Sequence, residues 1–100
     1  MSWIPQEQRV QSGLWRGETH MLQKEWFAAY RAFLAAARAA EGDDRELARG
    51  LAHAAAAGYK HLTGDGRGAA CQLAHARRRL APFMPRYREI DLEELLSGLP

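Results

Sequence analysis

Residues 45–80 constrain the fold more than any other part of this 100-residue chain. Their apolar and small side chains recur at three- and four-residue steps, the period of one helix face, over residues 47–62 and again over residues 69–80. Gly64-Asp65 separates the two runs. Glycine suits the left-handed residue just past a helix end, and Asp65 can accept hydrogen bonds from the first amides of the next helix. The stretch therefore predicts a helical hairpin.

The first forty residues predict two helices of unequal length. Pro5 suits the first turn of a short helix over residues 6–12, which stops at Gly13. A second helix is expected over residues 14–40, and about 27 residues would extend ~40 Å, so we expect its Ala-rich end to project, bend or meet a partner. Asp43 or Asp44 is expected to cap the following helix. The long helix carries one apolar stripe: Trp15, Thr19, Leu22, Trp26, Ala29, Phe33, Ala37 and Ala40.

The last twenty residues predict an irregular cover and a short closing helix. Pro82 and Pro85 interrupt the chain after Leu80, and nearby bulky groups can cover an open end of the bundle. Asp91-Leu92-Glu93-Glu94 has the spacing of a capping box, and no strand pattern is recognised. The predicted fold class is all-α, with residues 1–100 forming a single domain, an array or bundle of four to five helices around the central hairpin.

Composition favours a cytoplasmic protein. The lone Cys71 permits no intramolecular disulfide, which suits a reducing compartment. The first ten residues lack the basic start and apolar run of a secretory signal, and no stretch approaches the ~20 apolar residues of a membrane span. The net charge of +2 is too small to indicate a nucleic-acid binder by itself.

The order of motifs resembles domain-of-unknown-function family 309, a set of small bacterial and archaeal proteins. Residues 50–53, Gly-Leu-Ala-His, and residues 64–69, Gly-Asp-Gly-Arg-Gly-Ala, resemble its Gly-Leu-Ile-Gln and Gly-Asn-x-x-Gly-Ala, and depart from them at Ala52, His53 and Asp65. A second family motif, a Gly followed by His-Glu-x-x-Glu-x-x-Trp, aligns without gaps on Gly13 and Trp26. A one-residue shift would instead align the histidine of the family motif with His20. We prefer the ungapped register because it keeps Leu22 and Trp26 on the predicted buried stripe. The resemblance implies that the chain is an all-helical array and a diverged member of this family. The family has no established reaction that could be transferred to the chain.

Four polar side chains form the candidate ligand-binding site: Thr19, His20, Gln23 and His53. The ungapped register puts the first three at the polar positions of the family motif, while Gly50, Ala54 and Ala57 leave space beside His53. A helical His-Glu-x-x-Glu can bind a metal, but both carboxylates are missing here, so we expect no metal, no cofactor and no catalytic residue. The alternative is that these side chains only satisfy the backbone or one another at a helix interface.

Three functions remain open, and the sequence leans against an enzyme because no nucleophile, phosphate loop or zinc pattern is present. The first is a small helical interaction or small-ligand-binding module with an unknown protein or small-molecule partner, favoured by Trp3, Trp15 and Trp26 in so short a chain. The second is a degenerate member of a metal-dependent enzyme family. A homodimer is also expected, through Phe33, Leu34, Ala37 and Ala40 on the long helix.

The third function is weak nucleic-acid binding, which we do not expect. The one positive cluster recognised in the sequence consists of Arg77, Arg78 and Arg79 with Arg67, His75, Arg86 and Arg88. Three consecutive arginines spread around a helix, no aromatic platform is interleaved with them, and cations are common near helix C-termini. The cluster is therefore interpreted as a solvated face.

Overall fold

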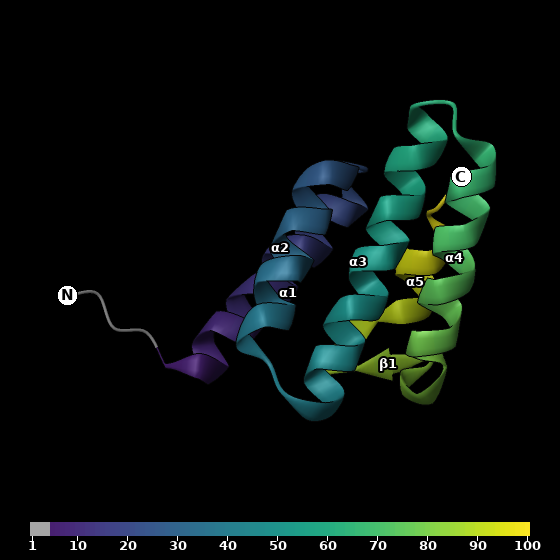
Figure 1. Ribbon diagram of the computed structural model, residues 1–100. Helices are drawn as coiled ribbons and strands as arrows, with labels where there is room; N and C mark the ends of the chain where they lie inside the picture. Colours follow the sequence, from purple (N-terminus) through teal and green to yellow (C-terminus); the bar gives the residue numbers. More distant parts are fainter. Residues whose placement is uncertain (1–4) are drawn as a thin grey trace.

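Four antiparallel helices form the body of the structure, a computed structural model that describes residues 5–100 (Figure 1). They are α1 (Gln6–Leu22), α2 (Trp26–Ala39), α3 (Gly42–Leu62) and α4 (Gly66–Leu80), and each packs mainly on its neighbours in sequence. A 3₁₀ turn, η1 (Ala81–Phe83), two short strands, β1 (Arg86–Tyr87) and β2 (Ile90–Asp91), and α5 (Leu92–Ser97) close the chain. The all-α fold class is confirmed. No described helix has the length and apolarity that crossing a membrane requires.

The predicted hairpin is α3 and α4. The amides of Gly64 and Asp65 donate to the carbonyls of His61 and Lys60 at 3.1 and 2.8 Å, with Gly64 at φ +87°, so α3 ends in a Schellman motif. Asp65 caps α4 by accepting a 2.8 Å bond from the amide of Gly68. The start of α3 was predicted wrongly: Glu41 occupies the N-cap position without a side-chain bond, and Asp43 and Asp44 lie in the first turn.

The long helix predicted over residues 14–40 is wrong, because the chain turns back at residues 23–25. Lys24 adopts φ 60°, and the amides of Lys24 and Glu25 donate to the carbonyls of Met21 and His20 at 3.0 and 2.9 Å. This is the same Schellman pattern that ends α3, with lysine in place of glycine. The turn divides the predicted apolar stripe: Trp26 is buried in α2, whereas Trp15 and Leu22 of α1 are 65% and 53% exposed.

Gly13 lies inside α1 and does not stop it, which corrects the predicted short helix. A Cβ at Gly13 would lie 2.8 Å from the Cβ of Ala36, and one at Gly17 would lie 2.4 Å from the ring of Phe33. Because residues four apart share a helix face, these two glycines let α1 approach α2 closely. They are packing glycines.

The predicted dimer surface lies inside the chain. Phe33 and Ala40 are 0% and 1% exposed, Ala37 is buried with them, and Leu34 packs against the same core. The turn at residues 23–25 folds α2 back against α1 and so covers a face that a straight helix would expose. Self-association remains a prediction, but these residues no longer support it, because the chain itself covers them. Trp3 lies outside the described residues.

The closing segment contains an antiparallel ladder that the sequence did not predict. Arg86 pairs with Asp91 and Tyr87 with Ile90, around a turn whose residues Arg88 and Glu89 have φ 52° and 62°. As predicted, Asp91 caps α5, accepting a 3.0 Å bond from the amide of Glu94.

Arg88 fixes this turn to the helices. It donates to Asp44 at 3.1 Å and to Gln11 at 2.7 Å, and it pairs with Glu7. Burial disfavours the charged form of Arg88, but its bonds with Glu7 and Asp44 outweigh that effect and raise its pKa. The closing segment is thereby tied to the starts of both α1 and α3.

Candidate anion-binding face

Thr19 and His20, two of the three polar residues predicted on the long helix, bond to groups near them in the chain. The hydroxyl of Thr19 donates to the carbonyl of Trp15 at 3.0 Å, and Nδ1 of His20 lies 2.8 Å from Oε1 of Glu25. Gln23 is exposed at the end of α1. These contacts match the alternative interpretation, in which such side chains satisfy one another or the backbone.

His53 lies elsewhere, on α3. Its Nδ1 is 2.7 Å from Oε1 of Gln72, and its ring stacks on that of His75 with centroids 5.1 Å apart. His53 borders a hollow with residues of α2, α3 and α4, whereas His20 borders one between α1 and α2. Because α2 lies between α1 and α3 (Figure 1), the structure does not gather the four predicted residues around one pocket. Their binding of a ligand remains a prediction.

Residues 5–100 contain no group of three His, Cys, Asp or Glu side chains placed to hold a metal ion. Arginine is the charged side chain that recurs around the hollows of the described surface.

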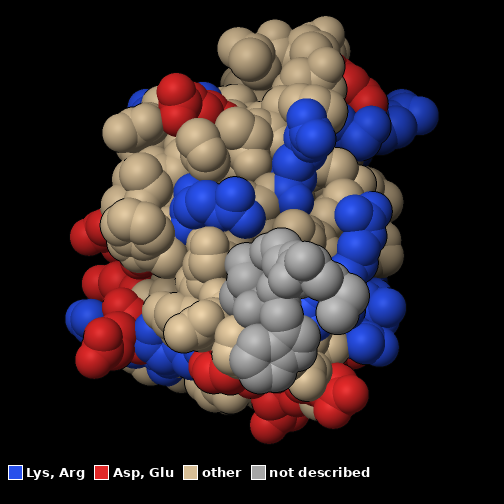
Figure 2. Space-filling model, turned by 90° about the vertical axis from the view of Figure 1, so that its left-hand side faces the viewer, with Lys and Arg blue, Asp and Glu red and all other residues tan. Residues whose placement is uncertain are grey.

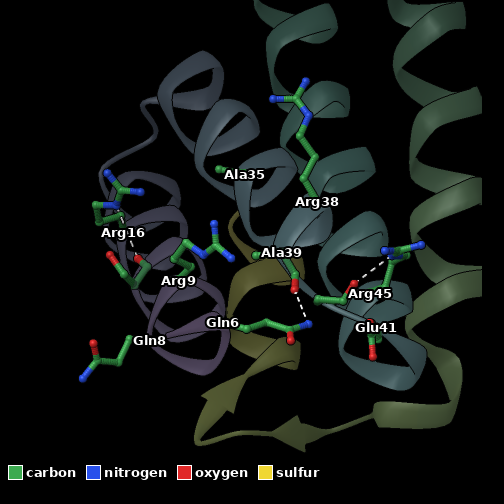
Figure 3. Close-up of a pocket in the computed structure, with 11 residues that line it drawn as sticks. Gln6, Gln8, Arg9, Arg16, Ala35, Arg38, Ala39, Glu41 and Arg45 are labelled. Atoms are coloured by element: carbon green, nitrogen blue, oxygen red, sulfur yellow. Dashed lines mark hydrogen bonds between the residues drawn. The ribbon is translucent and has the colours of Figure 1, made fainter. Parts of the chain in front are cut away.

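A hollow of about 600 Å³ opens between the first half of α1 and the end of α2 (Figure 3). Four arginines border it, Arg9 and Arg16 from α1, Arg38 from α2 and Arg45 from α3. Seven residues make almost two helical turns, so Arg9 and Arg16 lie on one side of α1. The other described residues around the hollow are small or polar: Gln6, Gln8, Ser12, Ala35, Ala39, Ala40 and Glu41.

Two neighbouring hollows extend this basic surface. One of about 320 Å³ is bordered by Arg16 and Arg31, and one of about 430 Å³ by Arg38, Arg45 and Arg49. Figure 2 shows basic side chains spread over this side of the molecule, with acidic ones mainly toward its margins. We call the surface the arginine face and define it by six residues: Arg9, Arg16, Arg31, Arg38, Arg45 and Arg49.

No ion pair within residues 5–100 compensates the positive charge of the arginine face. None of the ion pairs among the described residues involves any of its six arginines. Arg16 and Arg45 use Nε to donate to the carbonyls of Ser12 and Ala40, at 3.4 and 2.9 Å. Glu41 is the one acidic residue among the described residues that border the 600 Å³ hollow. Among the described residues the remaining guanidinium N–H groups have no protein acceptor, so they can donate to an external one.

Guanidinium groups suit this surface to anions. Each presents a planar fork of donors that matches two oxygens of a phosphate or carboxylate, and its charge persists at every physiological pH. Small alanines along α2, among them Ala28, Ala32 and Ala35, line the hollows and leave room between the arginines. The arrangement can bind several anionic groups at once, and arginine cannot donate or accept protons as a catalyst near neutral pH.

The basic cluster recognised in the sequence is a different one. Several of its members are paired: Arg79 with Glu46 at 2.6 Å, Arg86 with Asp91 at 3.8 Å, and Arg88 with Asp44. The interpretation that the chain has only one positive cluster is wrong, because the arginine face is a second one. A signal for the arginine face does exist, since Arg9 and Arg16, and then Arg31, Arg38 and Arg45, recur at seven-residue steps.

Comparisons of the chain with protein-family models, with curated proteins and with solved structures gave no significant match. The resemblance to domain-of-unknown-function family 309 therefore stays a prediction, and the function has to be inferred from the geometry of the chain itself.

Proposed function

We propose that this chain is a small helical binding module whose arginine face holds a ligand rich in phosphate groups. The observation that carries the proposal is the convergence of six arginines from three helices, none of them in an ion pair within the described part of the chain. Like charges gathered without counter-charges repel one another, so a polyanion gains free energy by neutralising them.

Phosphate is favoured over a single small carboxylate by the extent of the surface. Arg31 and Arg38 are seven residues apart on α2, which separates them by ~10 Å along the helix axis. One small anion cannot span that distance together with Arg9 and Arg49 on the flanking helices. A ligand with several regularly spaced negative groups can contact all three helices.

This proposal keeps the interaction or ligand-binding module expected from the sequence and specifies its ligand. The alternative, a degenerate metal-dependent enzyme, gains no support from the polar residues of α1, because His20 is bonded to Glu25 and Thr19 to the backbone. The proposal includes the cytoplasmic location expected from the lone cysteine, where phosphate-bearing polymers are abundant.

Binding of inorganic polyphosphate, measured by calorimetry over a range of salt concentrations, tests the proposal. We expect the affinity to fall steeply as salt rises, because the contacts are between exposed charges. The double variant Arg16→Gln/Arg38→Gln should weaken binding, since both residues border the 600 Å³ hollow.

The matched control is Arg67→Gln/Arg77→Gln, which removes the same charge from exposed positions on α4. It should lose much less affinity than the α1–α2 variant. Equal losses in the two variants would show that net charge alone governs binding and would contradict a defined site, as would binding that salt does not weaken.

A further inference from the structure

An exposed aromatic group adjoins the arginine face. Phe27, in the first turn of α2, and Tyr59, near the end of α3, are 52% and 43% exposed, and their ring centroids are 5.7 Å apart. Tyr30 stacks on Phe27, with centroids 6.4 Å apart and an angle of 27° between the ring planes. Three aromatic rings thus meet where the first turn of α2 faces the last turns of α3.

Two adjoining hollows, which we call the α2–α3 groove, connect Tyr30 to the arginines, and the first of them also reaches Gln72 and Arg79 of α4. Tyr30 and Arg49 border a hollow of about 300 Å³, and Arg49 also borders the next hollow along, with Arg38 and Arg45. Leu34 belongs to both hollows, so they adjoin. Tyr30 therefore lies at one end of the groove, with Phe27 stacked on it and Tyr59 beside Phe27, and the other end is cationic.

The span from the aromatic rings to the arginines is long enough for several units of a polymer. Phe27 and Arg38 are eleven residues apart on α2, which corresponds to ~16 Å along the helix. At the ~3.4 Å rise of one stacked strand this length holds about five nucleotides, and fewer if the strand is extended.

We propose that the α2–α3 groove binds single-stranded nucleic acid, with bases stacked against Phe27 and Tyr59 and the adjoining phosphates on Arg38, Arg45 and Arg49. The inference rests on the proposed function, since the same arginines hold the phosphates. It adds the chemical class of the ligand and a second set of contacts. It departs from the expectation drawn from the sequence, which judged nucleic-acid binding on a different arginine cluster that had no aromatic side chains interleaved with it.

The combination of flat rings and guanidinium groups favours this ligand over other polyanions. A single strand exposes the faces of its bases, which stack on aromatic side chains in a sequence-tolerant way, while its phosphates follow a basic groove. A duplex hides those faces within its base stack, and inorganic polyphosphate has none. An acidic peptide offers carboxylates but few flat groups to match three neighbouring rings.

The test uses fluorescence anisotropy of a labelled, unstructured oligouridine RNA, with inorganic polyphosphate as competitor. In the double variant Phe27→Leu/Tyr59→Leu, apolar bulk is kept and the rings are removed. We expect its RNA affinity to fall about five-fold or more, because bases can no longer stack on the rings. Its affinity for polyphosphate should be unchanged. Trp15→Leu is the matched control, since it removes a ring that is 65% exposed on α1, and it should leave RNA binding unchanged.

The arginines are tested in parallel. Arg45→Gln/Arg49→Gln should weaken RNA and polyphosphate binding together. It should also lower the slope of log affinity against log salt by about 0.7 for each phosphate that the variant no longer neutralises. Because Phe27 and Tyr59 are both exposed, we expect their replacement to leave the fold intact. A thermal melt that matches that of the parent chain verifies that each double variant is folded.

The outcomes separate the two proposals. If the RNA affinity is unchanged in Phe27→Leu/Tyr59→Leu, or if a duplex binds as tightly as the single strand, the inference is overturned while phosphate binding stands. If polyglutamate binds as tightly as both RNA and polyphosphate, the surface does not select phosphate, and both proposals are overturned. If neither RNA nor polyphosphate binds, the proposed function itself fails.

Discussion

Replacement of Gly13 by alanine tests the helix pairing that builds the arginine face. In a well-formed exposed helix, Gly→Ala stabilises by about 0.8–1 kcal/mol because glycine loses more backbone entropy on folding. At Gly13 the new Cβ would lie 2.8 Å from the Cβ of Ala36 and 3.0 Å from the carbonyl oxygen of Ala32. These atoms are parts of α2 with little freedom to move, so α2 has to shift.

Overpacking of this kind typically costs about 1–3 kcal/mol. Over most of that range the cost is larger than the stabilisation of about 0.8–1 kcal/mol that alanine gains over glycine in a helix. We therefore expect Gly13→Ala to lower the free energy of unfolding by about 1 kcal/mol, and to lower the melting temperature by roughly 4–8 °C, as is usual for a domain of this size. Chemical denaturation followed by far-UV circular dichroism measures the first quantity, and a thermal melt measures the second.

Gly66 provides the matched control, because it is also helical and nothing lies within 4 Å of a Cβ placed there. Gly66→Ala should be neutral or slightly stabilising. A Gly13→Ala variant that is more stable than the parent chain would refute the close α1–α2 packing, and would favour an exposed helix at this position instead.

Three further predictions concern the fold. Lys24→Gly should raise the free energy of unfolding by up to about 1 kcal/mol, because glycine accepts φ 60° without the strain of a side chain, whereas in a continuous helix it would destabilise by a similar amount; urea denaturation gives the sign. Leu51→Ala should cost about 2–5 kcal/mol in the same assay, since Leu51 is fully buried, and a loss below 1 kcal/mol would remove it from the core. Burial, with repulsion by Glu94 and Asp91, raises the pKa of Glu18 above its usual 4.5, so its ionisation destabilises the fold as pH rises through that raised pKa. Glu18→Gln should therefore stabilise the chain at neutral pH and have little effect well below pH 4.5, and equal effects at both pH values would contradict the assignment.

The two interhelical turns show what the sequence could reveal about the fold. Both turns place the same two hydrogen bonds around a left-handed residue, Lys24 in one and Gly64 in the other. Glycine indicates such a residue because it has no steric penalty there, so the α3–α4 turn was predictable. Lysine gives no such signal, and the apolar period continues across the turn from Leu22 to Trp26. A continuous helix was therefore the natural but wrong interpretation.

Gly13 gave a misleading signal in the opposite direction. A glycine can end a helix or can let two helices approach, and the choice depends on a partner that local sequence does not show. The β1–β2 ladder was missed for a related reason. Its turn residues, Arg88 and Glu89, are poor hairpin formers by themselves, and Arg88 is held by Glu7 and Asp44, more than 40 positions away in the chain.

The arginine face was not predicted because the wrongly predicted continuous helix over residues 14–40 places its arginines far apart. In a continuous helix Arg16 and Arg31 would lie ~22 Å apart along the axis, and Arg16 and Arg38 ~33 Å apart. The turn at Lys24 brings each of these pairs to the border of a single hollow instead. The seven-residue spacing of the arginines could indicate which face of each helix is basic, but it could not show that the faces meet. Concentrated positive charge is thus a product of the tertiary fold, and any change that opens the α1–α2 hairpin should weaken anion binding even when every arginine is retained.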